Sequence, residues 1–300
     1  MTAISVRNIK KSYGGTPVLK DLSFDVKRGE LFGIIGPDGA GKTTLFRILA
    51  TLLTADGGAA YVDGFNVLTD YKAIRQRVGY MPGRFSLYHD LSVEENLSFF
   101  ASVFGVTIED NYVLIRDIYR HLEPFKKRRA GKLSGGMKQK LALCCALIHK
   151  PSVLFLDEPT TGVDPVSRKE FWQMLCRLRE QDITLLVSTP YMDEATLCER
   201  IALMCDGAFL TIDTPAGIVE KFGEPLYAVT ATDMSRLLSD LRRAPEVKSC
   251  YAFGDVHHLA IRPGANLSLL ESRLKKEGYA DMAVRAIKPT VEDCFMALNS

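Results

Sequence analysis

The chain has 300 residues, of which 47% are hydrophobic and 25% are charged, and its formal net charge is +2. These proportions are ordinary for a globular protein and exclude disordered and fibrous classes. A charge this balanced gives no support for a nucleic-acid partner, which usually shows as a concentrated basic stripe. The length allows one large domain, or one large and one small domain.

Seven cysteines are scattered along the chain without a C-x-x-C pair. Metal-ligand spacing is therefore absent, and we expect a reduced, cytosolic chain. No apolar run reaches the roughly 18 residues that a membrane-spanning helix needs, and the N-terminus carries no signal-peptide pattern. We therefore expect a soluble protein. If it serves a membrane process, another chain must supply the membrane part.

The N-terminal half predicts strands that alternate with helices. Short strands are predicted over 3–9 and 22–26, around the turn Y-G-G-T-P. A continuous apolar run over 31–35 predicts a strand that is followed by a glycine-rich turn and a helix over 43–53. Further strands are predicted over 78–81, 153–156, 183–187 and 201–204. This alternation favours a mostly parallel sheet that is covered on both faces.

The segment from about residue 84 to residue 150 predicts a helical insertion, with helices over 93–104, 112–122 and 137–148. A boundary is predicted near K-F-G-E-P at 221–225. Strands are then predicted over 226–231, 247–253, 256–262 and 282–287, with helices over 233–242 and 268–277. This β-α-β-β-α-β order predicts a ferredoxin-like unit. We thus expect a large domain over 1–220 and a small one over 225–300.

The segment G-P-D-G-A-G-K-T-T fits the phosphate-binding pattern G-x-x-x-x-G-K-[ST], between a predicted strand and a predicted helix. Backbone N–H groups in such a loop surround the β-phosphate, and the helix dipole favours the anion. In this interpretation Lys42 reaches the β- and γ-phosphates of ATP, and the Thr43 hydroxyl ligates Mg²⁺. The alternative is a glycine turn without a ligand. The residues assigned to the nucleotide are Gly36, Pro37, Asp38, Gly39, Ala40, Gly41, Lys42, Thr43 and Thr44.

Two carboxylates end the predicted strand V-L-F-L-D-E. Asp157 is placed to orient a water on Mg²⁺, and Glu158 to polarise the attacking water as a general base, a role typically worth ~10²–10⁴ in rate. The pattern is weak evidence alone but strong downstream of a phosphate loop. Asp157, Glu158 and Lys42 are therefore the candidate catalytic residues.

A second anion site is predicted where L-S-G-G-M-K-Q opens an apolar helix. Its residues are Ser134, Gly135 and Gly136. The alternative is that Ser134 is an ordinary helix N-cap. Two phosphate sites on different helices suggest that ATP is shared across a dimer.

In this order and spacing, the phosphate loop, L-S-G-G-M-K-Q-K and L-F-L-D-E-P-T-T-G-V-D-P resemble the ATP-binding domain of ABC transporters over residues 1 to about 220. The resemblance implies an α/β P-loop NTPase core with an antiparallel β subdomain and a helical insertion. It also implies that Tyr13 stacks on adenine, that Ser134 to Gly136 contact the γ-phosphate bound by the other subunit, and that Asp164 lies in the loop linking the two sites. The phosphate loop and the C-terminal P-T-V-E-D-C-F further resemble exporter ATPases, in particular the first half of tandem multidrug-export ATPases.

The resemblance implies an ATPase that lies at the cytoplasmic, inner face of the cell membrane. Its partners would be ATP, a second ABC ATPase domain in a homodimer or heterodimer, and polytopic membrane permease subunits. Phe85, Leu87, Tyr88, Phe99 and Phe100 lie where this family docks the membrane subunit, although they are equally well explained as core of the helical insertion.

Two positions depart from the family pattern. Gly83 stands where the family has glutamine, and Pro190 stands where it has a histidine that contacts the γ-phosphate. Proline has no N–H and no side-chain donor. Arg84 or Tyr191 is considered as a residue that compensates for the missing glutamine and histidine. We expect the chain's own site to bind ATP and to hydrolyse it slowly, while its Ser134 motif completes a competent site on a partner.

Three alternatives stay open. They are a fully active homodimer, a soluble ABC ATPase that acts on ribosomes or DNA, and a regulatory subunit that binds ATP without hydrolysing it. His257 and His258 have no companion metal ligands in the sequence and are expected to be surface residues.

Overall fold

The computed structural model describes residues 1–299, which form two compact units. The first unit is Met1–Pro215, and the second begins at Ala216. The division therefore falls a few residues before the boundary that the sequence predicts near 221–225. Within residues 1–299, no helix combines the length and the apolarity needed to cross a bilayer.

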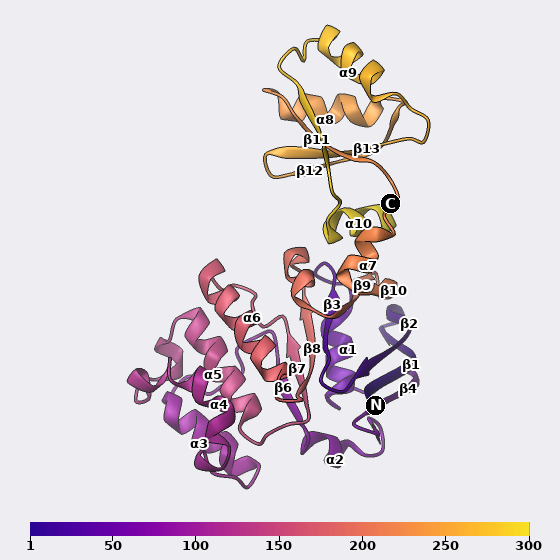
Figure 1. Cartoon of the computed structure of the whole chain (residues 1–300). Helices are drawn as coiled ribbons and strands as arrows, with labels where there is room; N and C mark the ends of the chain where they lie inside the picture. Colours follow the sequence, from indigo (N-terminus) through magenta and orange to yellow (C-terminus); the bar gives the residue numbers. More distant parts are fainter. Residues whose placement is uncertain (300) are drawn as a thin grey trace. The chain divides into compact units, whose positions relative to one another are not determined.

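A six-stranded sheet forms the centre of the first unit, in the order β10-β9-β3-β8-β7-β6 (Figure 1). The middle strands β3 (Leu31–Ile35), β7 (Val153–Asp157) and β8 (Thr184–Thr189) are buried along their whole length. Their neighbours are β6 (Val78–Met81), β9 (Arg200–Cys205) and the antiparallel edge strand β10 (Ala208–Asp213). The other pairs are parallel, so the carboxyl ends of β3, β7 and β8 meet at one edge. The mostly parallel sheet predicted from the sequence is confirmed.

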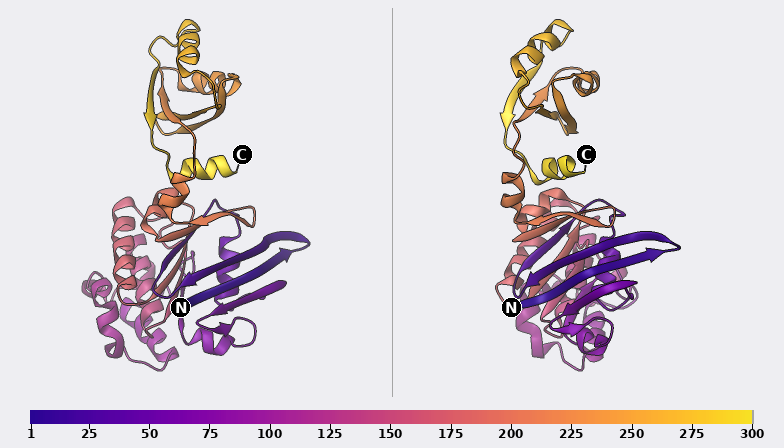
Figure 2. Two further views of the ribbon diagram at one scale, coloured as in Figure 1. Left: turned by 45° about the vertical axis from the view of Figure 1, so that its right-hand side comes forward. Right: turned by 90° about the vertical axis from the view of Figure 1, so that its right-hand side faces the viewer.

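A second, antiparallel sheet has the order β2-β1-β4-β5 and can be followed from two further sides in Figure 2. Its apolar side chains share one core cluster with those of α1 (Lys42–Leu49). Its strands are β1 (Thr2–Tyr13), β2 (Thr16–Lys27), β4 (Gly57–Val62) and β5 (Phe65–Asn66). The turn between β1 and β2 needs two glycines, because Gly14 and Gly15 have φ of 55° and 84°. The sequence predicts the first two strands but not β4, β5 or the short helix α2 (Tyr71–Arg75).

Helices gather on the other side of the six-stranded sheet (Figure 1). They are α3 (Val93–Val103), α4 (Tyr112–Tyr119), α5 (Gly135–Leu147) and α6 (Pro165–Arg179). A capping box of Ser92 and Glu95 begins α3. The helix predicted over 112–122 ends at Tyr119, and a short 3-10 helix containing Pro124 follows at Glu123–Phe125.

The second unit contains β11 (Leu226–Thr230), α8 (Met234–Arg243), β12 (Val247–Phe253), β13 (Val256–Ile261), α9 (Leu267–Lys276) and β14 (Ala283–Ile287). The sheet is antiparallel in the order β12-β13-β11-β14, and α8 and α9 bury leucines against it. This is the ferredoxin-like arrangement predicted from the sequence. Two further helices, α7 (Pro215–Glu220) and α10 (Val291–Leu298), flank it in the chain.

The expectation that His257 and His258 are surface residues is wrong. His257 is 4% exposed, and its Nε2 lies 2.7 Å from the carbonyl oxygen of Met234 in α8. His258 Nδ1 lies 2.6 Å from Asp293 Oδ1 in α10, and its ring stacks on Phe253. The reason is the position of β13 inside the sheet, because successive side chains point to opposite faces and both faces are covered there.

Candidate functional site

The loop between β3 and α1 is fitted closely against neighbouring backbone. A Cβ at Gly36 would lie 2.0 Å from the carbonyl oxygen of Met204, and one at Gly41 would lie 2.8 Å from that of Val18. Gly41 also has φ of 105°, a conformation that L side chains rarely adopt. The loop encloses a cavity of about 200 Å³ that is lined by Val18, Gly39, Gly41, Lys42, Thr43, Thr44 and Glu158. The structure thus gathers the second half of the phosphate loop and Glu158 around one small space. The other predicted loop residues, Gly36, Pro37, Asp38 and Ala40, do not line it.

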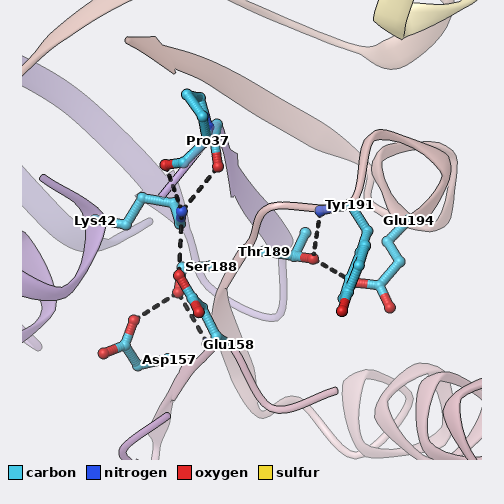
Figure 3. A network of polar contacts seen from close by, with 9 residues as sticks. Pro37, Lys42, Asp157, Glu158, Ser188, Thr189, Tyr191 and Glu194 are labelled. Atoms are coloured by element: carbon cyan, nitrogen blue, oxygen red, sulfur yellow. Dashed lines mark hydrogen bonds and ion pairs between the residues drawn. The ribbon is translucent and has the colours of Figure 1, made fainter. Parts of the chain in front are cut away.

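Lys42 is buried at the first position of α1, with its ammonium turned into this loop. Its Nζ donates to the carbonyl oxygens of Gly36 at 2.8 Å and Pro37 at 2.9 Å. It also lies 3.1 Å from Glu158 Oε1 (Figure 3). A cation that is held in a glycine loop at a helix N-terminus is placed to meet an anionic phosphate.

Asp157 lies at the end of β7, and only 2% of it is exposed. Burial raises the pKa of its carboxyl group, while hydrogen bonds with Ser188 and Thr43 act in the opposite direction and offset part of the shift. Ser188 Oγ donates to Asp157 Oδ1 at 2.7 Å. The Thr43 hydroxyl and the Asp157 carboxylate are hard oxygen donors of the kind that Mg²⁺ takes beside phosphate oxygens, so these residues fit that ion.

Glu158 has a left-handed backbone with φ of 51°, which is unfavourable for a residue with a side chain. Its N–H donates to the carbonyl oxygen of Ser188 at 3.1 Å and to Ser188 Oγ at 3.0 Å. This turn directs the carboxylate toward Lys42 rather than along the strand. Ser188 therefore holds the carboxylate of Asp157 and the backbone of Glu158, a role that the sequence does not reveal.

Both departures from the family pattern border the site. A Cβ at Gly83 would lie 2.9 Å from the carbonyl oxygen of Asp157. Pro190 follows Thr189, whose carbonyl oxygen accepts the N–H of Gly36 at 3.3 Å. Neither Gly83 nor Pro190 has a polar side-chain atom, so the two positions supply no side-chain donor to the cavity.

Tyr191, considered as a substitute for the missing histidine, does not line the phosphate cavity. Its N–H donates to Thr189 Oγ1 at 3.1 Å, and its ring lies 4.6 Å from the guanidinium of Arg168. Figure 3 shows Tyr191 beside Glu194, on the far side of Thr189 from Lys42. Arg84, the other residue considered for this role, is exposed.

Ser134, Gly135 and Gly136 begin α5, on the opposite side of the six-stranded sheet from α1 (Figure 1). Ser134 is the N-cap of that helix, because its Oγ accepts the N–H of Met137 at 3.4 Å. Ser134 and Gly135 are exposed. The predicted second anion site is therefore a capped helix start that faces solvent, separate from the phosphate loop of its own chain.

Tyr13 lies at the end of the β1–β2 hairpin and is 47% exposed. Lys11 Nζ lies 5.9 Å from the centre of its ring. Val18, five residues further on, lines the phosphate cavity. Tyr13 itself does not line that cavity, and its role toward adenine stays a prediction.

A strand, a phosphate loop and a helix, with two carboxylates at the end of a nearby parallel strand, define a P-loop ATPase. Residues 19–161 match the family model described as "ABC transporter". The chain is 33% identical to "Nod factor export ATP-binding protein I" of Bradyrhizobium diazoefficiens, over 99% of this chain and 96% of that protein. It belongs to the family of ABC transporter ATP-binding proteins.

A second relative is "Probable multidrug ABC transporter ATP-binding protein YbhF" of Escherichia coli (strain K12). The two are 36% identical over 98% of this chain, which spans only 52% of that relative. Among solved structures, "Structure of ATP binding subunit of ABC transporter" aligns with a TM-score of 0.67 and 26% identity, over 74% of this chain and 93% of that one. "Dimeric structure of a post-hydrolysis state of the ATP-binding cassette MJ0796 bound to ADP and Pi" aligns with a TM-score of 0.64 and 26% identity, over 70% and 98%.

Proposed function

We propose that this chain is the ATP-binding and ATP-hydrolysing subunit of an ABC exporter. It pairs with a second ABC ATPase domain and drives polytopic membrane subunits from the cytoplasmic face of the cell membrane. The observation that carries the proposal is the contact of Lys42 with Glu158 inside the phosphate loop. The relatives named for multidrug and Nod factor export support the direction of transport.

In the proposed reaction the phosphate-loop N–H groups and Lys42 bind the β- and γ-phosphates of ATP. Glu158 accepts a proton from water as the water oxygen attacks the γ-phosphorus, and the bond from that phosphorus to the bridging oxygen breaks to release ADP. Thr43 and Asp157 would hold Mg²⁺, which neutralises charge on the phosphates when it is bound. Position and electrostatics supply most of the catalysis in such a reaction.

We further propose that the two nucleotide sites of the dimer are unequal. The site on this chain lacks side-chain donors at Gly83 and Pro190, and this favours slow hydrolysis there. The Ser134 to Gly136 motif is intact, with Ser134 and Gly135 exposed, and it suits contact with the γ-phosphate on a partner's loop. The dimeric MJ0796 cassette, which has a similar fold, supports pairing of two such domains.

Rapid-quench measurement of ATP hydrolysis tests this inequality. The chain would be assayed alone and then mixed with the second ATPase domain of its transporter. We expect slow turnover alone and faster turnover in the mixture. Gly135→Asp should abolish the gain, because it places a carboxylate against the partner's phosphate, while ATP binding to this chain persists. Fast hydrolysis by the chain alone, abolished by Glu158→Gln, would overturn the inequality and favour an active homodimer. No hydrolysis in either state, with ATP still bound, would favour the regulatory subunit.

The membrane subunit is proposed to dock on a groove between β6 and the helices. This groove has a volume of about 400 Å³ and is lined mainly by apolar side chains that include Leu52, Met81, Leu87, Phe100, Val103 and Phe104. Val103 is 61% exposed. The groove includes two of the residues that the family resemblance assigns to docking, Leu87 and Phe100, and an apolar helix is the natural occupant.

Val103→Asp tests the docking proposal. We expect it to prevent co-purification with the membrane subunit from detergent extract and to leave ATP binding unchanged. Val113→Asp is the matched control, because Val113 is also exposed but does not line this groove. Equal co-purification of both variants would contradict the docking site. Co-sedimentation of the wild-type chain with ribosomes would instead favour the soluble ABC ATPase.

A further inference from the structure

A buried carboxylate outside the nucleotide cavity connects the two loops that build the site. Glu194 follows β8 in a short 3-10 helix, and its side chain is 3% exposed. Its Oε1 accepts a hydrogen bond from Thr160 Oγ1 at 2.8 Å, and its Oε2 accepts one from Thr189 Oγ1 at 2.5 Å. Both threonines are buried as well. One side chain thus bridges the loop after β7 and the end of β8. Figure 3 shows the contact with Thr189.

These two attachment points lie directly beside the catalytic groups. Thr160 is two residues beyond Glu158, within the turn in which Thr161 N–H donates to the carbonyl oxygen of Glu158 at 3.2 Å. Thr189 follows Ser188, which holds the N–H of Glu158. The left-handed backbone of Glu158 is therefore fixed from one side by Ser188 and from the other by the segment that Glu194 holds.

The charge of Glu194 is partly balanced by one cation. Arg168 of α6 has its Nε 3.8 Å from Glu194 Oε1 and also reaches Asp193 at 3.6 Å. Its guanidinium lies over the ring of Tyr191. The carboxylate therefore sits in a fully bonded polar cluster, which holds its members in one arrangement.

We propose that Glu194 is a positioning residue of the nucleotide site, whose carboxylate ties the loop after Glu158 to the end of β8 and so keeps the Glu158 carboxylate directed at Lys42. The inference rests on the proposed function, because it assigns Glu194 a role in ATP hydrolysis. Glu194 is not among the residues that line the phosphate cavity, and it acts through Glu158.

The competing account is that Glu194 only satisfies buried hydroxyl groups and contributes stability. Glu30 offers a matched control for that account. It is 6% exposed, accepts the N–H of Lys27 at 2.6 Å and pairs with Arg200 at 3.1 Å. Removing either carboxylate should lower the free energy of unfolding. Only Glu194 should change the chemistry at Glu158.

The experiment measures single-turnover hydrolysis and ATP affinity separately in the full chain. We expect Glu194→Ala to lower the hydrolysis rate by about tenfold to a hundredfold, since small displacements of a reacting group have effects of that size. Its dissociation constant for ATP should stay within about twofold of the wild-type value. Glu194→Gln should recover part of the rate, because an amide can still bond both threonines. Glu30→Gln should leave the rate unchanged.

The double variant shows whether Glu194 acts through Glu158. In the Glu158→Gln background, Glu194→Ala should cause no further loss of rate, since two residues that act as a unit are not additive. The inference would be overturned if the rate losses of the two variants were additive, or if Glu194→Ala lowered ATP affinity in parallel with the rate. It would also be overturned if Glu194→Ala left the hydrolysis rate unchanged, or if Glu30→Gln lowered that rate equally.

Hydrogen exchange separates this inference from the proposed function. Glu194→Ala should speed exchange of the N–H groups of Thr161 and Val163, which close the turn after Glu158, and Glu30→Gln should not. Suppose that the wild-type chain hydrolyses no ATP but Glu194→Ala still speeds amide exchange in this turn. The proposed hydrolysis then fails, and the link made by Glu194 between the two loops has a structural role only. Unchanged amide exchange in Glu194→Ala would show that Glu194 does not hold the turn after Glu158.

Discussion

Ser188 and Asp157 are 31 positions apart in the chain, yet they lie side by side on neighbouring parallel strands, with Ser188 Oγ donating to Asp157 Oδ1 at 2.7 Å. The same hydroxyl accepts the N–H of Glu158. A single serine therefore orients the carboxylate proposed for Mg²⁺ and the backbone of the proposed base. The effect of replacing Asp157 therefore depends on whether the new side chain can still accept from Ser188.

Asp157→Asn should stabilise the nucleotide-free protein at neutral pH. Burial raises the folded-state pKa of Asp157 above its ordinary value of 3.8. Between these two pKa values the folded state binds more protons than the unfolded state, so this group makes stability fall as pH rises through that window. Asparagine removes the buried charge and can still accept from Ser188. At pH 7 we expect the melting temperature to rise by about 2–4 °C for each kcal/mol that the substitution adds to the free energy of unfolding.

Calorimetry at two pH values provides the control for this prediction. Below about pH 3.8 Asp157 is protonated in both states, so the difference between Asp157→Asn and wild type should disappear there. A lower melting temperature of the variant at pH 7 would contradict the account. The variant should also lose the dependence of ATP binding on Mg²⁺, since an amide oxygen is a weaker ligand than a carboxylate.

His149 should make the first unit sensitive to acid. Burial lowers the pKa of its imidazole to about 4, and the ring stacks on Phe104 with centroids 3.7 Å apart. The unfolded state therefore takes up a proton at higher pH than the folded state. Stability should fall as pH drops from about 6.5 toward 4, by roughly 3 kcal/mol in total.

His149→Phe should remove this acid sensitivity and keep the ring stack. Urea unfolding at pH 7 and at pH 4.5 measures it as the change in the free energy of unfolding. His89→Phe serves as the control, because His89 is exposed and also contacts an aromatic ring, that of Phe85. If His149→Phe loses as much stability as wild type between the two pH values, the buried imidazole is not the cause.

Replacing Gly83 and Pro190 by the glutamine and histidine of the family pattern should have unequal effects on the hydrolysis rate. Pro190→His replaces a half-buried side chain beside the phosphate loop, and a donor there should raise the single-turnover hydrolysis rate about tenfold or more. Gly83→Gln should help little by itself, because its Cβ would lie 2.9 Å from the carbonyl oxygen of Asp157 and the strand end would have to move. Rapid-quench assays of the single and double variants measure both effects. An equal gain from each single variant would contradict this reading of Gly83.

The sequence predicts the parts of this protein whose patterns are local. The buried runs β3 and β6 begin and end where predicted, because an uninterrupted apolar segment of strand length has few other solutions. The phosphate loop is equally local, since its glycines and Lys42 lie within nine residues. By contrast β4 and β5 are short and rich in glycine, alanine or polar residues, so no apolar alternation marks them.

The site contacts that the sequence does not reveal are long-range. Glu194 and Thr160 are 34 positions apart, and their contact depends on the order of β7 and β8 in the sheet. Nothing in the local pattern around His258 indicates that Asp293 of α10 covers it. Such contacts are set by topology and packing rather than by propensity.

Glu158→Gln should separate binding from hydrolysis. Lys42 Nζ lies 3.1 Å from the Glu158 carboxylate, so this negative charge both competes for the lysine and opposes the approach of a phosphate. Glutamine removes the charge and keeps the side-chain size, and we expect ATP to bind severalfold more tightly while hydrolysis falls to a small residual rate. Lys42→Ala should instead abolish tight ATP binding, because the buried cation of the loop is gone. Equilibrium binding of a fluorescent ATP analogue, with the rate measured in parallel, distinguishes the two. Weaker ATP binding by Glu158→Gln than by wild type would show that Glu158 supports the nucleotide rather than opposing it.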